Sequence, residues 1–178
     1  HKYVYNEYLK IKGEGTEKLN VVTCHLGKGS SISAIENHRA VDTTMGLTPL
    51  EGLIMGTRSG SVDPAAVLIL QELENLSPQE MMNVLNKKSG LRSISGISYD
   101  MRQLRKATLE GNKRAQTAID MLAYQVAKYI GSYAVAMGGL DAIVFTGGIG
   151  EHSFFVRSAI MDYLKPFGLT YDKEKNDN

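Results

Sequence analysis

The sequence predicts an α/β fold in which helices flank a mixed sheet, and three observations support this prediction. Residues 20–43 contain three short segments rich in β-branched residues, separated by tight turns, which is typical of an antiparallel meander. Helical patterns occupy the middle of the chain. The apolar run DAIVFT then leads through GGIG into a further helical pattern. This order of elements indicates one layered domain, which we expect to span residues 1–178.

The N-terminal elements are predicted from periodicity and turns. In HKYVYNEYLKIKGEG, Val4, Tyr8 and Ile11 lie on one helical stripe, and glycines end the helix. The strands of the meander read LNVVTCHL, SISAIENH and RAVDTTMG. We therefore expect one helix followed by three antiparallel strands.

Capping signals divide the middle of the chain into several helices. TPLEGLIMG predicts a short helix that Thr48 caps. Asp-Pro at 63–64 and Ser-Pro at 77–78 predict helices in PAAVLILQELENL and in QEMMNVLNKKSG, the second ending at Gly90. A Ser/Gly loop is expected next, and then a helix from about Tyr99.

The clearest helical pattern runs from Asn112 to Met137 and stops at a glycine pair. Apolar residues recur along it every three or four positions: Ile119, Leu122, Val126, Ile130, Tyr133 and Met137. Residues 142–145 of DAIVFT predict a buried strand that joins the sheet of the meander. A helix is expected through SFFVRSAIMDYL, and KPFGLTYD is expected to lead into another strand.

Composition excludes several classes of protein. A hydrophobic content of 43% is that of a folded globular protein. Lys+Arg 20 and Asp+Glu 19 nearly balance, so no surface for nucleic acid is indicated. The apolar runs are too short to span a membrane, and the lone Cys24 excludes an internal disulfide, so a cytoplasmic protein is expected. The four histidines lack metal-ligand spacing, so no metal site is predicted in this chain.

The glycines after DAIVFT are the first candidate binding site. A strand that feeds a glycine turn and then a helix leaves free backbone N–H groups, which favour a phosphate or the edge of a nucleotide. Gly147, Gly148 and Gly150 let a ligand approach the backbone closely. Their spacing differs from the dinucleotide-binding fingerprint. A tight turn without a ligand is the alternative.

Two further segments are candidates for ligand contact. In the hairpin turn HLGKGSS, residues 25–31, N–H groups and serine hydroxyls offer donors to a phosphate, with Lys28 as a point charge. The alternative is an ordinary hairpin turn. In SYDMR, Asp100 is placed to accept hydrogen bonds from hydroxyls, with Arg102 nearby, and the alternative is a capping aspartate.

Arg58 is predicted to lie in a loop. Its neighbours in GTRSGSVDP include two glycines and an Asp-Pro step, which impose turns. A guanidinium fixed in such a loop suits a bidentate grip on a phosphate or a carboxylate. The alternative is an ion pair that ties the loop to a neighbouring carboxylate.

Taken in order, the motifs HKYV, CHLGKGSS, VDTTMGLTPLEGLIMGTRSGSVDP, SYDMR and VFTGGIGE resemble those of the acetate kinase family along essentially the whole chain. The resemblance implies a ribonuclease H-like, actin-like ATPase fold. The chain is similar to most of the family's C-terminal half, and His1 matches the last histidine of the family's HGTSH motif. We therefore expect a single nucleotide-binding domain from a two-domain kinase.

The resemblance also implies a reaction, the reversible transfer of the γ-phosphate of ATP to acetate, giving ADP and acetyl phosphate, with Mg²⁺ at the phosphates. Arg58 matches the arginine implied to stabilise the phosphoryl group in transfer. The segments implied to hold the nucleotide match His25, Leu26, Gly27, Lys28, Gly29, Asp100, Met101, Arg102, Gly147, Gly148, Ile149, Gly150 and Glu151. The catalytic aspartate, the metal contacts and the acetate pocket are implied to lie outside this chain. An inactive isolated chain and a homodimeric full-length protein are therefore expected.

The chain departs from the family at three positions. Lys28 and His152 stand where the family usually has Asn, and Ser61 stands where it usually has Asp. Lys28 adds a positive charge beside the phosphates, and Ser61 removes a carboxylate near Arg58. These departures are compatible with altered kinetics, or with a related acyl kinase such as a propionate kinase. A nucleotide-dependent, actin-like binding or scaffold protein is the alternative from another class.

Overall fold

The structure, a computed structural model, describes residues 1–16 and 18–177. The chain divides into two compact units. We call residues 1–44 and 123–178 the sheet unit, and residues 45–122 the helical unit. The expected single nucleotide-binding domain therefore stays a prediction.

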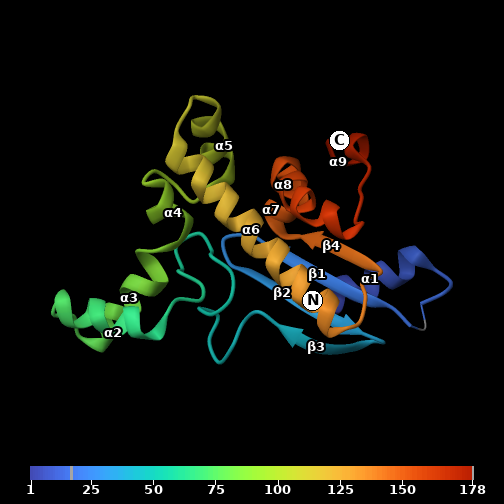
Figure 1. Cartoon of the computed structure of the whole chain (residues 1–178), viewed down its shortest axis with the longest axis horizontal. Coiled ribbons are helices and arrows are strands. Elements are labelled where there is room, and N and C mark those ends of the chain that lie inside the picture. The colour runs from blue at the N-terminus through green and yellow to red at the C-terminus, as the bar shows by residue number, and fades with distance from the viewer. Residues whose placement is uncertain (17, 178) are drawn as a thin grey trace. The chain divides into compact units, whose positions relative to one another are not determined.

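The sheet unit contains a four-stranded mixed sheet with the order β3-β2-β1-β4 (Figure 1). Its strands are β1 (Asn20–Leu26), β2 (Ser30–Glu36), β3 (Arg39–Thr43) and β4 (Ala142–Thr146). The first three are antiparallel neighbours, whereas β4 pairs in parallel with β1. The predicted α/β fold with a mixed sheet, in which residues 142–145 join the meander, is confirmed.

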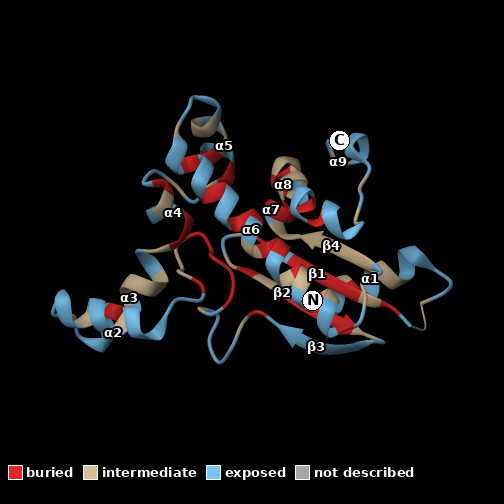
Figure 2. Ribbon diagram, in the orientation of Figure 1, coloured by how far each residue is buried: buried red, intermediate tan, exposed pale blue. Residues whose placement is uncertain are grey.

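Burial follows the position of each strand in the sheet. The central strand β1 has fully buried Val21, Val22, Cys24 and Leu26, so it reads as a nearly continuous apolar run. Figure 2 shows the contrast with β3, which is exposed along its whole length at the edge. The strand β4 is half-buried rather than buried as predicted.

The helix α1 (Lys2–Lys12) precedes the strands of the sheet unit. The helices that follow β4 are α7 (Gly147–His152), α8 (Phe154–Leu164), η1 (Lys165–Phe167) and α9 (Lys173–Asp177). In α1 the buried residue is Tyr5, with Tyr8 and Leu9 packed against the same cluster. The predicted stripe is wrong at Ile11, which is 86% exposed, because the apolar face turns toward Tyr5. The GGIG glycines form the first turn of α7 rather than a turn before a helix.

The helical unit contains α2 (Pro64–Leu73), α3 (Pro78–Lys87), α4 (Gly90–Ser95), α5 (Met101–Leu109) and the start of α6 (Lys113–Ala136). Two predicted caps are confirmed: Asp63 accepts from the Ala65 N–H, and Ser77 forms a capping box with Glu80. The predicted core stripe along α6 is also confirmed, since its six residues from Ile119 to Met137 are all buried. No helix among the described residues is long and apolar enough to cross a membrane.

Three predicted elements are wrong. TPLEGLIMG is not helical, because its backbone groups bond instead to later residues of the same loop. For example, the Ser61 N–H donates to the Gly52 carbonyl oxygen. Gly90 does not end α3 but begins α4, in the region expected to be a loop. KPFGLTYD leads not into a strand but into α9, at whose start the Asp172 carboxylate accepts from the Lys175 N–H.

Candidate functional site

Two of the predicted nucleotide-binding segments meet at one end of the sheet. Because β1 and β4 are parallel neighbours, His25 lies opposite Thr146, and the segments that follow the two strands begin side by side. A Cβ on Gly147 would lie 2.6 Å from the Leu26 carbonyl oxygen and 3.1 Å from His25 Cε1. Gly147 also has a φ of 79°, so glycine is required for this approach. Binding of a nucleotide by these two segments stays a prediction.

The serine hydroxyls of the hairpin turn after β1 form hydrogen bonds within the chain. The Gly27 N–H donates to Ser30 Oγ at 3.2 Å, and the Ser30 hydroxyl lies 3.1 Å from the Gly27 carbonyl oxygen. Ser31 Oγ lies 2.8 Å from His1 Nε2, and His1 Nδ1 lies 2.7 Å from Thr23 Oγ1. Both serine hydroxyls are therefore engaged within the chain. We expect a ligand at this turn to meet backbone N–H groups instead.

The Glu151 carboxylate accepts hydrogen bonds at the start of α7. Its Oε1 accepts from the Gly147 N–H at 2.9 Å and from the Thr146 hydroxyl at 3.2 Å. The partial positive charge at a helix N-terminus stabilises a carboxylate in this place. A phosphate at the same point would meet like charge, so this end of α7 suits the uncharged part of a nucleotide better than its phosphates.

Three of the predicted nucleotide residues direct their side chains into the protein. Leu26 is fully buried, and Met101 and Ile149 are 4% and 9% exposed. These side chains stabilise the segments that carry them. Only their backbone groups are available to a ligand.

Asp100 and Arg102 bind each other at the start of α5. Asp100 Oδ1 accepts from the Arg102 backbone N–H at 2.9 Å, and Oδ2 accepts from Arg102 Nη2 at 2.6 Å. These hydrogen bonds lower the pKa of Asp100 to about 2. The structure thus shows the capping alternative. Both residues belong to the helical unit, so their approach to the turns at the end of the sheet stays a prediction.

The loop that carries Arg58 is held by the start of α4. The N–H groups of Ser89, Leu91 and Arg92 donate to the carbonyl oxygens of Thr57, Met55 and Gly56 at 3.1, 2.9 and 3.1 Å. These bonds satisfy N–H groups that a helix start otherwise leaves free. They fix the backbone of the three residues that precede Arg58.

Gly90 makes this close contact possible. Its φ is 71°, and a Cβ there would collide with the Met55 carbonyl oxygen and lie 2.8 Å from the Arg58 carbonyl oxygen. The sequence does not indicate this role, because a glycine after Lys-Lys-Ser is typical of the end of a helix. The loop that lies against Gly90 is distant in sequence, so no local signal identifies the contact.

Within the described residues, the Arg58 guanidinium makes two hydrogen-bond contacts, both to neutral groups. Its Nη1 lies 3.4 Å from the Pro49 carbonyl oxygen and 3.4 Å from Met55 Sδ. Across residues 1–16 and 18–177 no carboxylate lies within ion-pair distance of the guanidinium. The ion-pair alternative is therefore not what the structure shows. Ser61 Oγ accepts from the Gly52 N–H at 3.1 Å and so helps to hold the same loop.

Other reactive groups offer no site. Cys24 is buried in β1, and burial raises the pKa of its thiol, which disfavours the nucleophilic thiolate. In the part of the chain that the structure describes, no three His, Cys, Asp or Glu side chains form a group able to hold a metal ion.

Known proteins resemble this chain along its whole length. The acetokinase family matches residues 1–178. The curated acetate kinase of Thermoanaerobacterium thermosaccharolyticum is 55% identical over 99% of this chain and 44% of its own length. That of Caldicellulosiruptor saccharolyticus is 54% identical over 100% of this chain and 45% of its own length.

Two solved structures resemble the chain closely. The acetate kinase of Porphyromonas gingivalis has a TM-score of 0.95 and 43% identity, covering 99% of this chain and 44% of that one. A propionate kinase of Francisella tularensis has a TM-score of 0.93 and 43% identity, covering 99% and 45%. The chain spans less than half the length of each of these relatives. It belongs to the acetokinase family.

Proposed function

We propose that the full-length protein is an acetate kinase, which transfers the γ-phosphate of ATP to acetate and forms ADP and acetyl phosphate reversibly. The observation that carries this proposal is the 55% identity to a curated acetate kinase along 99% of the chain. Because the chain spans 44% of that relative, the activity is proposed for the longer protein.

In the proposed reaction a carboxylate oxygen of acetate attacks the γ-phosphorus. The bond from phosphorus to the β–γ bridging oxygen breaks, and ADP leaves with that oxygen. Negative charge spreads over the equatorial oxygens of the transferring group, where a planar cation stabilises it. Arg58 is the proposed cation: its loop is held by backbone hydrogen bonds, and its two hydrogen-bond contacts among the described residues are 3.4 Å long and go to neutral groups.

The nucleotide is proposed to lie against residues 25–29 and 147–151, with residues 100–102 contributing from the helical unit. The support is that the first two segments begin side by side at one end of the sheet. The carboxylate of Glu151 at the start of α7 favours the nucleoside there, which leaves the hairpin turn with Lys28 for the phosphates. Mg²⁺ is expected to accompany the nucleotide. Among the described residues no three His, Cys, Asp or Glu side chains form a group able to hold it.

A propionate kinase is the second candidate, favoured by the solved propionate kinase with 43% identity. A pocket that distinguishes one methylene gives about a 10–200-fold difference in kcat/KM. Rates of ADP formation by the full-length protein with acetate and with propionate therefore decide between the two. ATP binding without acceptor-dependent ADP formation would instead support the actin-like scaffold alternative.

We also propose that the full-length protein is a cytoplasmic homodimer. This rests on the family resemblance. Sedimentation of the full-length protein at micromolar concentration tests the dimer, and a monomer there would contradict it.

A further inference from the structure

Arg157 in α8 holds the C-terminal end of α7. Its Nη1 donates to the carbonyl oxygens of Gly150 and Glu151 at 2.9 and 2.7 Å. Carbonyls at the end of a helix lack partners within the helix and carry partial negative charge, so a cation is favoured there. One side chain therefore fixes the segment that we propose lines the nucleotide.

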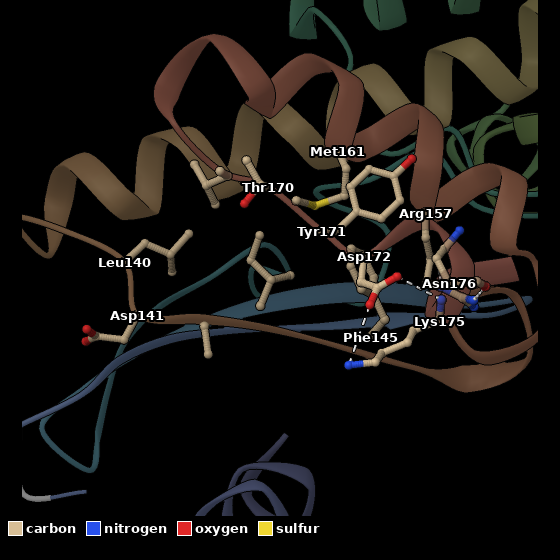
Figure 3. Close-up of a pocket in the computed structure, with 13 residues that line it drawn as sticks. Leu140, Asp141, Phe145, Arg157, Met161, Thr170, Tyr171, Asp172, Lys175 and Asn176 are labelled. Atoms are coloured by element: carbon tan, nitrogen blue, oxygen red, sulfur yellow. Dashed lines mark hydrogen bonds and ion pairs between the residues drawn. The ribbon is translucent and has the colours of Figure 1, made fainter. Parts of the chain in front are cut away.

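Asn176 in α9 holds Arg157 in turn. Arg157 Nε donates to Asn176 Oδ1 at 2.7 Å, and Nη2 donates to the Asn176 carbonyl oxygen at 2.6 Å. The Asn176 side-chain amide donates to the Phe154 carbonyl oxygen at 3.1 Å and to Ser158 Oγ at 3.0 Å, both in α8. Figure 3 shows Arg157 and Asn176 beside each other at one end of a pocket of about 490 Å³ next to β4. Asn176 thus binds Nε and Nη2 of the guanidinium, whereas Nη1 binds α7.

The arrangement uses the planar shape of arginine rather than its charge alone. Among the described residues no carboxylate lies within ion-pair distance of Arg157. Its donors are divided between α7 and Asn176, and the fork geometry of the guanidinium allows both sets of bonds at once. An ammonium group is a single point and cannot reproduce both.

We infer that Arg157, locked by Asn176, is a positioning residue that sets residues 147–151 for binding of the nucleotide. It acts through the backbone of Gly150 and Glu151 and does not touch the ligand. Arg157 also affects the start of α7 through Glu151, because the Glu151 carboxylate accepts a hydrogen bond from the Gly147 N–H. The inference rests on the proposed function, because it requires a nucleotide at this segment.

The test compares variants of the full-length protein by calorimetric titration with ADP and by steady-state kinetics. Arg157→Lys and Asn176→Ala should each raise the Kd for ADP and the KM for ATP about tenfold, while kcat and the KM for acetate stay within about twofold. The double variant should bind ADP about as well as the weaker single variant, because the two residues act as one unit.

Two further variants separate positioning from a general structural effect. Asn176→Asp keeps an acceptor for Arg157 Nε but loses the donors to the Phe154 carbonyl oxygen and Ser158 Oγ, so its Kd for ADP should lie between those of the parent and Asn176→Ala. Lys175→Ala removes an exposed ion pair to Asp172, 3.5 Å long, one position from Asn176, and should leave the Kd unchanged. A simple loss of folded protein would lower the active fraction in every assay and leave the KM for ATP unchanged.

Each outcome is decisive. A parent that binds no ADP would contradict the proposed function itself. A parent that binds ADP, with Arg157→Lys binding equally well, would overturn the inference alone. Losses that multiply in the double variant would overturn the link through Asn176. If Arg157→Lys does not fold, hydrogen exchange decides: protection of residues 147–152 must fall in Asn176→Ala, and unchanged protection would overturn the inference.

Discussion

Replacement of Gly90 by alanine tests whether the start of α4 sets the position of Arg58. Two separate costs follow from the structure. Alanine at a φ of 71° costs about 1–2 kcal/mol, because the left-handed region disfavours a Cβ. The added Cβ also collides with the Met55 carbonyl oxygen and lies 2.8 and 3.0 Å from the oxygen and nitrogen of the Arg58 backbone. These are backbone atoms on the arginine loop itself, so the loop must move to relieve the collision.

The size of the effect follows from that movement. Restoring ordinary contact distances requires a shift of the loop on the order of 1 Å, and a misplacement of that size costs about a hundredfold in rate. We therefore expect Gly90→Ala in the full-length protein to lower kcat about a hundredfold. The KM for ATP should change far less, because Arg58 is proposed to act on the phosphoryl group in transfer.

Gly111→Ala is the matched control. Gly111 has a φ of 89° and no atom within 4 Å of an added Cβ, so this variant carries the backbone strain without the collision. It should lose stability and keep the parent's kcat. The measurements are thermal unfolding and steady-state ADP formation at saturating ATP and acetate. A folded Gly90→Ala protein with the parent's kcat would refute the reasoning, and so would equal losses of kcat in both variants.

Three other predictions address the remaining features. The hydrogen bonds from Arg102 lower the pKa of Asp100 to about 2, below the value of about 3.9 for an unfolded chain. Asp100 therefore stabilises the protein above about pH 4 and loses this contribution as the pH falls through 2, so unfolding midpoints of the parent and Asp100→Asn should differ at pH 7 and converge near pH 2. The isolated 178-residue chain should form no ADP, and measurable turnover would show that the missing half is dispensable. Tyr5→Phe removes the hydroxyl that lies 3.1 Å from His38 Nδ1, so it should lower stability by about 1 kcal/mol in thermal unfolding, and an unchanged midpoint would exclude a role for this contact.

Local signals account for the elements that the sequence predicted correctly. The caps at Asp63 and Ser77 and the apolar period of α6 each act within a few residues, so sequence alone reveals them. The Thr48-Pro49 pattern is equally local but misleading. Leu53, Ile54 and Met55 are buried in a non-helical loop whose carbonyls bond to α4, and these contacts come from residues distant in sequence.

The sequence predicted the segments of the candidate site but not the residues that hold those segments in place. The glycines and the Asp-Pro step placed Arg58 in a loop, and the parallel pairing of β1 with β4 brings two predicted segments together. The roles of Gly90 and of the pair Arg157–Asn176 are not visible in the sequence, because each acts through backbone atoms of another segment. Asp100 and Arg102 lie at the start of a helix, as expected. They also bind each other, and the sequence alone does not show whether two nearby opposite charges form a pair.

The most direct test of the central claim is the steady-state rate of acetate-dependent ADP formation by the full-length parent, Arg58→Ala and Arg58→Lys. Arginines that stabilise a transferring phosphoryl group contribute about 10³-fold or more, so we predict a fall in kcat of about a hundredfold or greater for Arg58→Ala. Arg58→Lys should not restore the rate, because an ammonium lacks the fork geometry, and ADP affinity should change little in either variant. A parent with no acetate-dependent turnover, or an Arg58→Ala variant as fast as its parent, would contradict the account.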